Sequence, residues 1–202
     1  MLLFYLTPVW GTILARAFLG DVITVPRVIA MILAIFGMLT IFGLGAQFPT
    51  PKNAGDWMGL GSGILWAIAM VRIRGAQSHS AVDMTIGFFQ WSLVFSAGAA
   101  LILAPHHVPS VAQTLPAMPL LLIFMAFLVL PGTYASLWGP KHLSPGVVGL
   151  LFMTEIVVGA VSVALLAGEP FGVRELTGVI LIAGASLLEP IVALLNARSR
   201  AV

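Results

Sequence analysis

The sequence has no cysteine and few charged residues. Nine Lys or Arg and seven Asp or Glu make up 8% of the 202 residues. Without cysteine the chain has no disulfide framework and no thiolate chemistry. A soluble domain has about 25% charged residues, so this chain cannot cover a water-facing surface. The pattern G-x-x-x-x-G-K-[ST] is absent, which excludes nucleotide binding through a P-loop.

The sequence contains long apolar stretches with few charged residues. Hydrophobic residues make up 60% of the chain, and the mean hydropathy is +1.10. Runs of about 20 apolar residues suit ~30 Å of hydrocarbon. The sequence therefore predicts an all-α integral membrane protein, a multi-span helix bundle. Seven spans can be drawn: Leu2–Leu19, Pro26–Leu44, Trp57–Val71, Met84–Leu103, Leu120–Trp138, Gly146–Ala167 and Leu176–Leu195.

The positive charges predict how these spans are oriented. When successive loops alternate sides, one side receives seven Lys or Arg residues: Arg16, Arg27, Arg72, Arg74, Lys141, Arg198 and Arg200. The other side receives only Lys52 and Arg174. By the positive-inside rule we expect a plasma (inner) membrane protein with a cytoplasmic C-terminus. The lipid bilayer is the expected partner, nucleic acid is not, and a homo-oligomer remains an open alternative.

One stretch of the chain recurs after 148 residues. Leu2–Asp21 aligns with Leu150–Glu169 without a gap, and each copy ends on Gly followed by an acidic residue. Five spans separate the copies, so the first enters the membrane from outside and the second from inside. We therefore expect an inverted repeat, which is typical of secondary transporters with a site near the membrane midplane.

These residues resemble the EamA-type drug/metabolite transporter superfamily. Leu2–Gly43 and Leu150–Leu188 look like the last two helices of each family repeat, and Gly55–Ala76 is similar to the family's sixth helix, with Trp66-Ala67 near its inner end. The resemblance implies two inverted five-helix repeats. Residues 1–45 would hold the last two helices of the first repeat, 46–55 a linker, and 56–202 the complete second repeat. Seven spans stand here where the pattern has ten, so the first three helices have no counterpart.

The function implied by this resemblance is secondary, ATP-independent transport, with efflux of small organic metabolites or drugs. The alternative is a truncated, non-transporting membrane fragment that contributes helices to another membrane protein. We expect no enzyme activity, no cofactor and no metal. The four histidines fall on both sides of the drawn membrane, His79 and His142 on one and His106 and His107 on the other.

Glu155 is the main candidate for a site residue. It lies near the middle of its span, where an ionised group costs about 2.5–3.5 kcal/mol and is tolerated when it faces protein or water. Gly159 and Ser162 follow on the same helical face. Thr7 is the counterpart of Glu155 in the first copy. We expect a carboxyl that binds substrate or protons; a structural hydrogen bond to a neighbouring helix is the alternative.

Other candidates are spread over three further spans. Pro131 and Gly132 interrupt their span, and a broken helix can offer free carbonyls to a substrate. A packing kink is an equal alternative. Tyr134 and Trp138 would form an aromatic wall nearby, and Gln90 could donate a hydrogen bond to substrate or to a helix. Trp66 could line the same cavity, although an interfacial anchor is the preferred interpretation.

Two further features predict packing. Glu189-Pro190 is typical of a helix bend, which we expect Arg198 or a loop to stabilise. Gly59, Gly63, Gly178 and Gly184 suit close contact between helices, because small residues let backbones approach.

Overall fold

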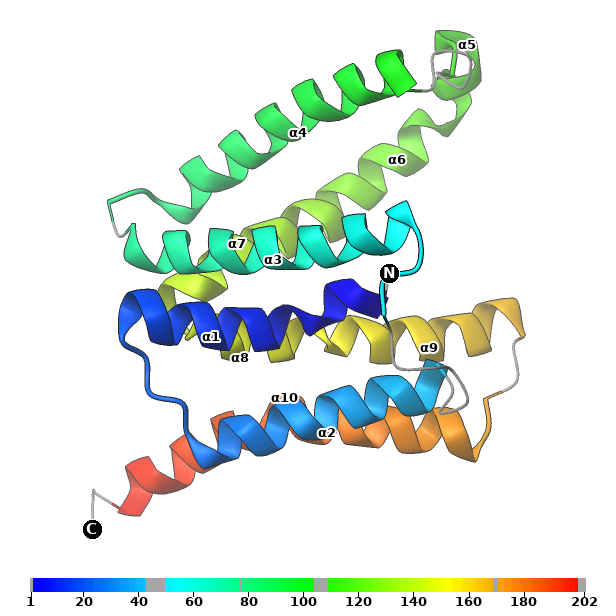
Figure 1. The fold of residues 1–202 in the computed structure, drawn as a ribbon. Coiled ribbons are helices and arrows are strands. Elements are labelled where there is room, and N and C mark those ends of the chain that lie inside the picture. The colour runs from blue at the N-terminus through cyan, green and yellow to red at the C-terminus, as the bar shows by residue number, and fades with distance from the viewer. Residues whose placement is uncertain (1, 43–49, 77, 104–108, 169–170, 200–202) are drawn as a thin grey trace. The chain divides into compact units, whose positions relative to one another are not determined.

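The computed structural model describes residues 2–42, 50–76, 78–103, 109–168 and 171–199 (Figure 1). Its regular elements within these ranges are all helical. In chain order they are a 3-10 turn Leu2–Leu6, α1 Thr7–Leu19, α2 Val25–Phe42, α3 Ala54–Gly75, α4 Ala81–Leu103, α5 Val111–Thr114, a 3-10 turn Leu115–Ala117, α6 Met118–Phe124, a π-helical segment Met125–Val129, α7 Leu130–His142, α8 Pro145–Phe152, α9 Thr154–Ala167 and α10 Val173–Ser199.

Five helical segments are long and apolar enough to cross a membrane. They are Val25–Phe42, Ala54–Gly75, Ala81–Leu103, Ala112–His142 and Pro145–Leu166. Large apolar side chains stand exposed on them, such as Phe127 at 78% and Leu166 at 88%. Such surfaces suit contact with lipid rather than water. The prediction of an all-helical, multi-span membrane fold is confirmed at this level.

The helices form two compact units, Met1–Gly75 with Leu143–Val202, and Ala76–His142. The first unit combines helices from both ends of the sequence. These units do not coincide with the division at residues 45 and 56 that the resemblance implies.

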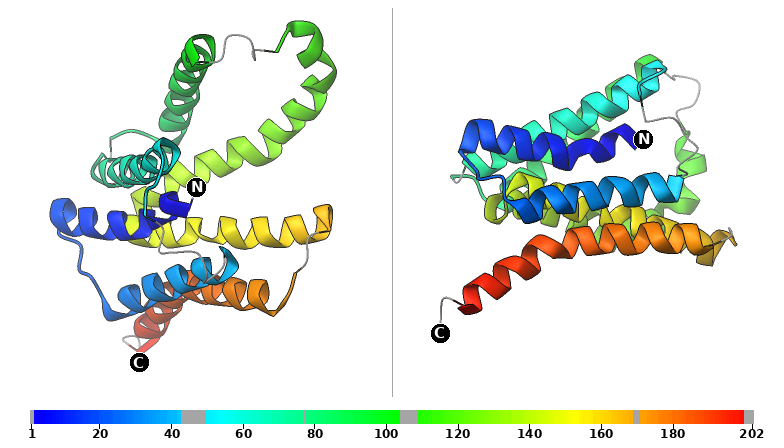
Figure 2. Two further views of the ribbon diagram at one scale, coloured as in Figure 1. Left: turned by 45° about the vertical axis from the view of Figure 1, so that its right-hand side comes forward. Right: turned by 60° about the horizontal axis from the view of Figure 1, so that its bottom comes forward.

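Two antiparallel helix pairs build the first unit: α1 packs on α8, and α2 packs on α10 (Figures 1 and 2). Glycines make both contacts close. A Cβ added at Gly149 would lie 2.7 Å from the Cα of Pro8, and one added at Gly37 would lie 2.8 Å from the carbonyl oxygen of Gly178. The predicted close contacts are thus present at Gly178 and Gly63, whereas Gly184 faces open space.

The core of this unit lies between these pairs. Its main cluster joins small residues of α2 with larger residues of the α8–α9 region and α10: Ala30, Ala34, Met38, Leu150, Met153, Ile156, Ile182 and Ala185. A second cluster holds α3 against α1 and α8 through Ala67, Met70 and Val148. Small residues on α2 let the longer side chains interlock, as close packing requires.

Helix boundaries recur at the offset found in the sequence. α1 ends at Leu19 and α9 at Ala167, and each is followed by a glycine in the left-handed region, Gly20 at φ 71° and Gly168 at φ 69°. The next helices begin at Val25 and Val173. Each of these boundaries is displaced by 148 residues, so both copies end their first α-helix at a left-handed glycine.

The second unit folds α4 back along the segment from α5 to α7. Ser80 caps the start of α4: its Oγ accepts the backbone N–H of Asp83 at 3.0 Å. The π-helical segment Met125–Val129 ends two residues before Pro131. A proline ring clashes with the carbonyl four residues earlier, and a wider turn there relieves that clash. The predicted interruption near Pro131 takes this π-helical form.

Candidate functional site

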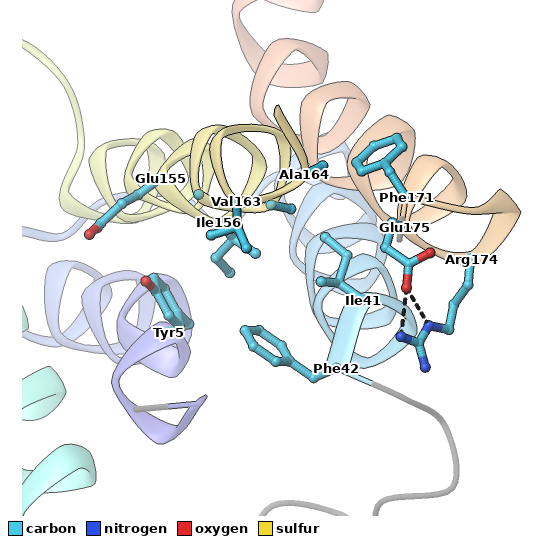
Figure 3. Close-up of a pocket in the computed structure, with 12 residues that line it drawn as sticks. Tyr5, Ile41, Phe42, Glu155, Ile156, Val163, Ala164, Phe171, Arg174 and Glu175 are labelled. Atoms are coloured by element: carbon cyan, nitrogen blue, oxygen red, sulfur yellow. Dashed lines mark hydrogen bonds and ion pairs between the residues drawn. The ribbon is translucent and has the colours of Figure 1, made fainter. Parts of the chain in front are cut away.

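A cavity of about 480 Å³ opens in the first unit beside α9 (Figure 3). Its wall comes from the first 3-10 turn, the end of α2, the face of α9 and the start of α10. The lining residues are Tyr5, Ile41, Phe42, Glu155, Ile156, Gly159, Ala160, Val163, Ala164, Phe171, Arg174 and Glu175. Most of this wall is apolar or aromatic, with few polar groups, as is typical of sites for small organic molecules.

The polar groups gather at opposite ends of the cavity. Glu155 and Tyr5 lie at one end, and Arg174 and Glu175 lie at the other (Figure 3). Glu155 stands in the first turn of α9, where the partial positive charge of a helix N-terminus favours a carboxylate. Its side chain is exposed to the cavity. Glu155 is therefore accessible from the cavity.

Glu175 is engaged by its own helix. Its Oε2 accepts the backbone N–H of Gly172 at 2.9 Å, and its Oε1 accepts the Nε–H of Arg174 at 2.8 Å. Its own backbone N–H contributes most to lowering the pKa of the Glu175 carboxyl below its ordinary value, followed by Gly172 and Arg174. This carboxylate is committed to capping α10, as Glu at the third helical position often is.

A break in the helix positions Glu155. Met153 separates α8 from α9, and Thr154 donates its hydroxyl to the carbonyl oxygen of Leu151 at 2.6 Å. A similar bond lies one position later in the first copy, where the Thr7 hydroxyl bonds to the carbonyl oxygen of Phe4 at the start of α1. A threonine hydroxyl that bonds to the preceding turn bends a helix. Neither helix boundary was predicted from the sequence; the local signal is a threonine beside Glu155 and another beside Pro8.

Of the predicted candidates on these two helices, Glu155 and Gly159 line the cavity. Ser162 is half-buried on α9 and is not part of the lining. Thr7 is 2% exposed and packs against α3, where a Cβ added at Gly63 would lie 3.1 Å from its Oγ1. Trp66 belongs to the second core cluster and contacts Phe152, with ring centres 5.9 Å apart.

The remaining candidates belong to the second unit. Pro131 and Tyr134 line a separate apolar cavity of about 340 Å³, together with Val82, Thr85, Ile86 and Leu130. Trp138 stacks on His142 with ring centres 4.0 Å apart, and the carbonyl oxygen of Gly132 accepts the Ser136 hydroxyl at 2.7 Å. Gln90 is exposed on α4. None of Gln90, Gly132 and Trp138 lines either of the two cavities.

A buried ion pair between α2 and α10 was also missed. The Arg27 guanidinium binds the Glu189 carboxylate through Nη2 at 2.5 Å and through Nε at 3.1 Å to each oxygen. The two side chains are 7% and 17% exposed. The expectation that Arg198 or a loop stabilises Glu189 is replaced by this pair; the Arg198 side chain lies outside the described residues. The antiparallel packing of α2 on α10, which the sequence does not display, brings the two residues together.

Metal binding finds no support in the described part of the chain, which holds no group of three or more His, Cys, Asp or Glu side chains that could hold an ion. Comparisons with family models, curated proteins and solved structures found no match. The interpretation of the site therefore rests on its own geometry.

Proposed function

We propose that the protein is a secondary membrane transporter that moves small organic solutes without ATP. The observation that carries the proposal is the cavity beside α9, whose wall contains the intramembrane acid Glu155 directly after a helix break. Broken helices with polar groups at the break are how many secondary transporters bind solutes within the membrane. An ionisable residue within a membrane span is a candidate functional residue by default.

The paired helices support an inverted repeat. The boundaries displaced by 148 residues fall at the ends of α1 and α9 and at the starts of α2 and α10. The corresponding helices run in opposite directions, because α1 is antiparallel to α8 and α2 is antiparallel to α10 (Figure 1). This is the arrangement expected when two copies of a helix pair enter a membrane from opposite sides. The resemblance to the EamA-type superfamily predicts the same arrangement.

The cavity wall suggests the chemistry of the solute. Aromatic and aliphatic side chains would hold an apolar body, while Glu155 and Tyr5 offer a carboxyl and a phenol at one end. A carboxyl there can bind a proton or an amine of the solute, and either would make Glu155 part of the transport cycle. The seven-span topology, the inner-membrane location and the cytoplasmic C-terminus belong to this proposal.

A flux screen of the complete gene product tests the proposal. Vesicles that contain the protein are loaded with a panel of small amines, amino acids and aromatic solutes, and their loss is compared with that from protein-free vesicles. We expect at least one solute to leave faster through the protein, with no requirement for ATP. Correct insertion with no solute moved would instead favour the alternative, that the chain supplies helices to another membrane protein.

A further inference from the structure

The Arg27–Glu189 pair covers a buried face of α1. Arg27 and Thr12 both lie against Gly146 at the start of α8. A Cβ added at Gly146 would lie 2.2 Å from Thr12 Oγ1 and 3.5 Å from Arg27 Cδ. Thr12 itself is 2% exposed. The ion pair therefore closes the end of the unit at which α1, α2, α8 and α10 meet.

The face that is buried on α1 corresponds to the face that is open on α9. Five cavity-lining positions of α9 are Glu155, Ile156, Gly159, Ala160 and Val163. The residues 148 positions earlier are Thr7, Pro8, Gly11, Thr12 and Ala15, and these are the buried residues of α1. Equivalent surfaces of the two copies thus differ: all five positions on α1 are packed, whereas those on α9 line a cavity and only Ile156 among them is also buried in the core.

The ion pair has no equivalent at the opposite end of the α2–α10 pair, which borders the cavity beside α9. The positions related to Arg27 and Glu189 by the same displacement are Glu175 and Ile41. Ile41 cannot form an ion pair, and Glu175 binds Arg174 of its own helix. Among the described residues, the ion pair between α2 and α10 lies at the end near Thr12, whereas Ile41 and Glu175 at the other end line the cavity.

The end of the unit at which α1, α2, α8 and α10 meet also buries polar atoms that have no hydrogen-bond partner. Within the described residues, Thr12 Oγ1, Asp21 Oδ2 and Ser144 Oγ are buried and accept or donate no hydrogen bond. Thr12 lies on α1, Asp21 just after it, and Ser144 at the start of α8. Buried polar groups are usually paired, and an unpaired group lowers stability. Water would satisfy all three if this end opened.

We propose that the Arg27–Glu189 pair is the latch of a gate, and that its release opens a second cavity, lined by Thr12, at the expense of the one beside α9. This rests on the proposed function, because exchange between two such states is how an inverted repeat presents one site to either side of a membrane. The pair stabilises the described state, and the related faces of α1 and α9 exchange their exposure when it breaks.

Thiol reactivity tests the gate without a known solute. The chain has no cysteine, so Thr12→Cys and the related Ala160→Cys each give one reactive site in otherwise unchanged protein. With the pair intact, we expect the cysteine at 160 to react with a water-soluble maleimide and the one at 12 to be protected. The double variant Arg27→Gln/Glu189→Gln leaves no lone buried charge. It should raise reactivity at position 12 by about tenfold or more, and lower it at 160, because the population shifts between two states.

The charge exchange Arg27→Glu/Glu189→Arg is the matched control and should restore protection at position 12. If reactivity at 12 rises while that at 160 stays constant or also rises, the pair is a structural clasp and the gate is refuted. Should the double variant fail to fold, spin labels at Thr24 and Ile191 in the conservative variant Arg27→Lys, which loses the forked guanidinium contact, give an independent result. A second, longer distance that is absent from the protein with the pair intact supports the gate, and an unchanged single distance refutes it.

The gate and the transporter can fail separately. If reactivity at the two positions exchanges but the flux screen moves no solute, the gate stands and the transport proposal falls. If solute moves through a protein whose two positions do not exchange, the gate falls and the transport proposal stands.

Discussion

Gly20 and Gly168 each end a helix with a positive φ, 71° and 69°. A side chain in this region costs about 1–2 kcal/mol, because its Cβ crowds the next carbonyl oxygen. We expect Gly20→Ala and Gly168→Ala each to lower the free energy of unfolding by about 1 kcal/mol. Thermal unfolding in detergent, followed by circular dichroism, measures the change.

The control for this pair is Gly61→Ala. Gly61 lies inside α3, and a Cβ there meets nothing within 4 Å. Alanine favours a helix interior over glycine by about 1 kcal/mol, so this variant should be neutral or more stable. Equal losses in all three variants would show that the left-handed turns are not the cause.

Glu175 makes stability depend on pH. Its pKa is lowered in the folded protein, chiefly by its own backbone N–H and by that of Gly172. A carboxyl with a depressed pKa stabilises the fold above its unfolded pKa, and this contribution is lost as the pH falls through the folded pKa. The melting temperatures of the wild type and Glu175→Gln should therefore differ most near neutral pH and converge in acid. A difference that does not change with pH would contradict this.

At the scale of elements, the contact between α2 and α10 depends on two facing glycines. A Cβ added at Gly178 would lie 2.4 Å from Ile41 Cγ1 and 2.7 Å from the carbonyl oxygen of Gly37. Gly178→Val should force the helices apart and lower stability by about 1–3 kcal/mol, as overpacking does. Thermal unfolding checks this, and Gly184→Val on the open face of α10 is the control. Equal effects of both variants would contradict the packing described for this pair.

The elements also show what the sequence could and could not predict. Apolar run length located the long helices, five of which could cross a membrane, and the Gly-acid ending of each copy located the helix ends at Gly20 and Gly168, because both signals are local. The helix boundaries at Thr7 and Met153 were not predicted, because a hydroxyl that bonds to the preceding turn accompanies each of them and the same bond also occurs inside unbroken helices, as at Ser62. The Arg27–Glu189 ion pair was not predicted because it joins residues 162 positions apart. The spacing of apolar residues along a sequence does not indicate which helices pack against each other.

At the scale of the whole molecule, the candidate site was predicted in part. Glu155 and Gly159 share one helical face, so their lining of one cavity follows from helix periodicity. Tyr5, Phe42 and Phe171 could not be found this way, because they come from three other parts of the chain. Ser162 shares the predicted face but falls outside the lining, since α9 presents Val163 and Ala164 there instead.

The predicted topology concerns the whole chain and can be tested by labelling. Single cysteines at Lys52, His107 and Arg200 place one reporter in each of three predicted loops or tails, and the native chain offers no competing thiol. By the positive-inside rule, the first two should react with an impermeant reagent on intact cells and the third only after permeabilisation. Labelling of Arg200→Cys on intact cells would overturn the orientation.

The central claim is that the cavity beside α9 binds solute through Glu155, and solute flux in Glu155→Gln tests it most directly. Glutamine keeps the size of the side chain and most of its hydrogen bonds but cannot ionise. Glu175→Gln is the matched control, because that carboxylate lines the same cavity but already caps α10. The account predicts that Glu155→Gln inserts and folds as the wild type does yet loses flux by about tenfold or more, while Glu175→Gln retains it. Wild-type flux by Glu155→Gln at every pH would contradict the account.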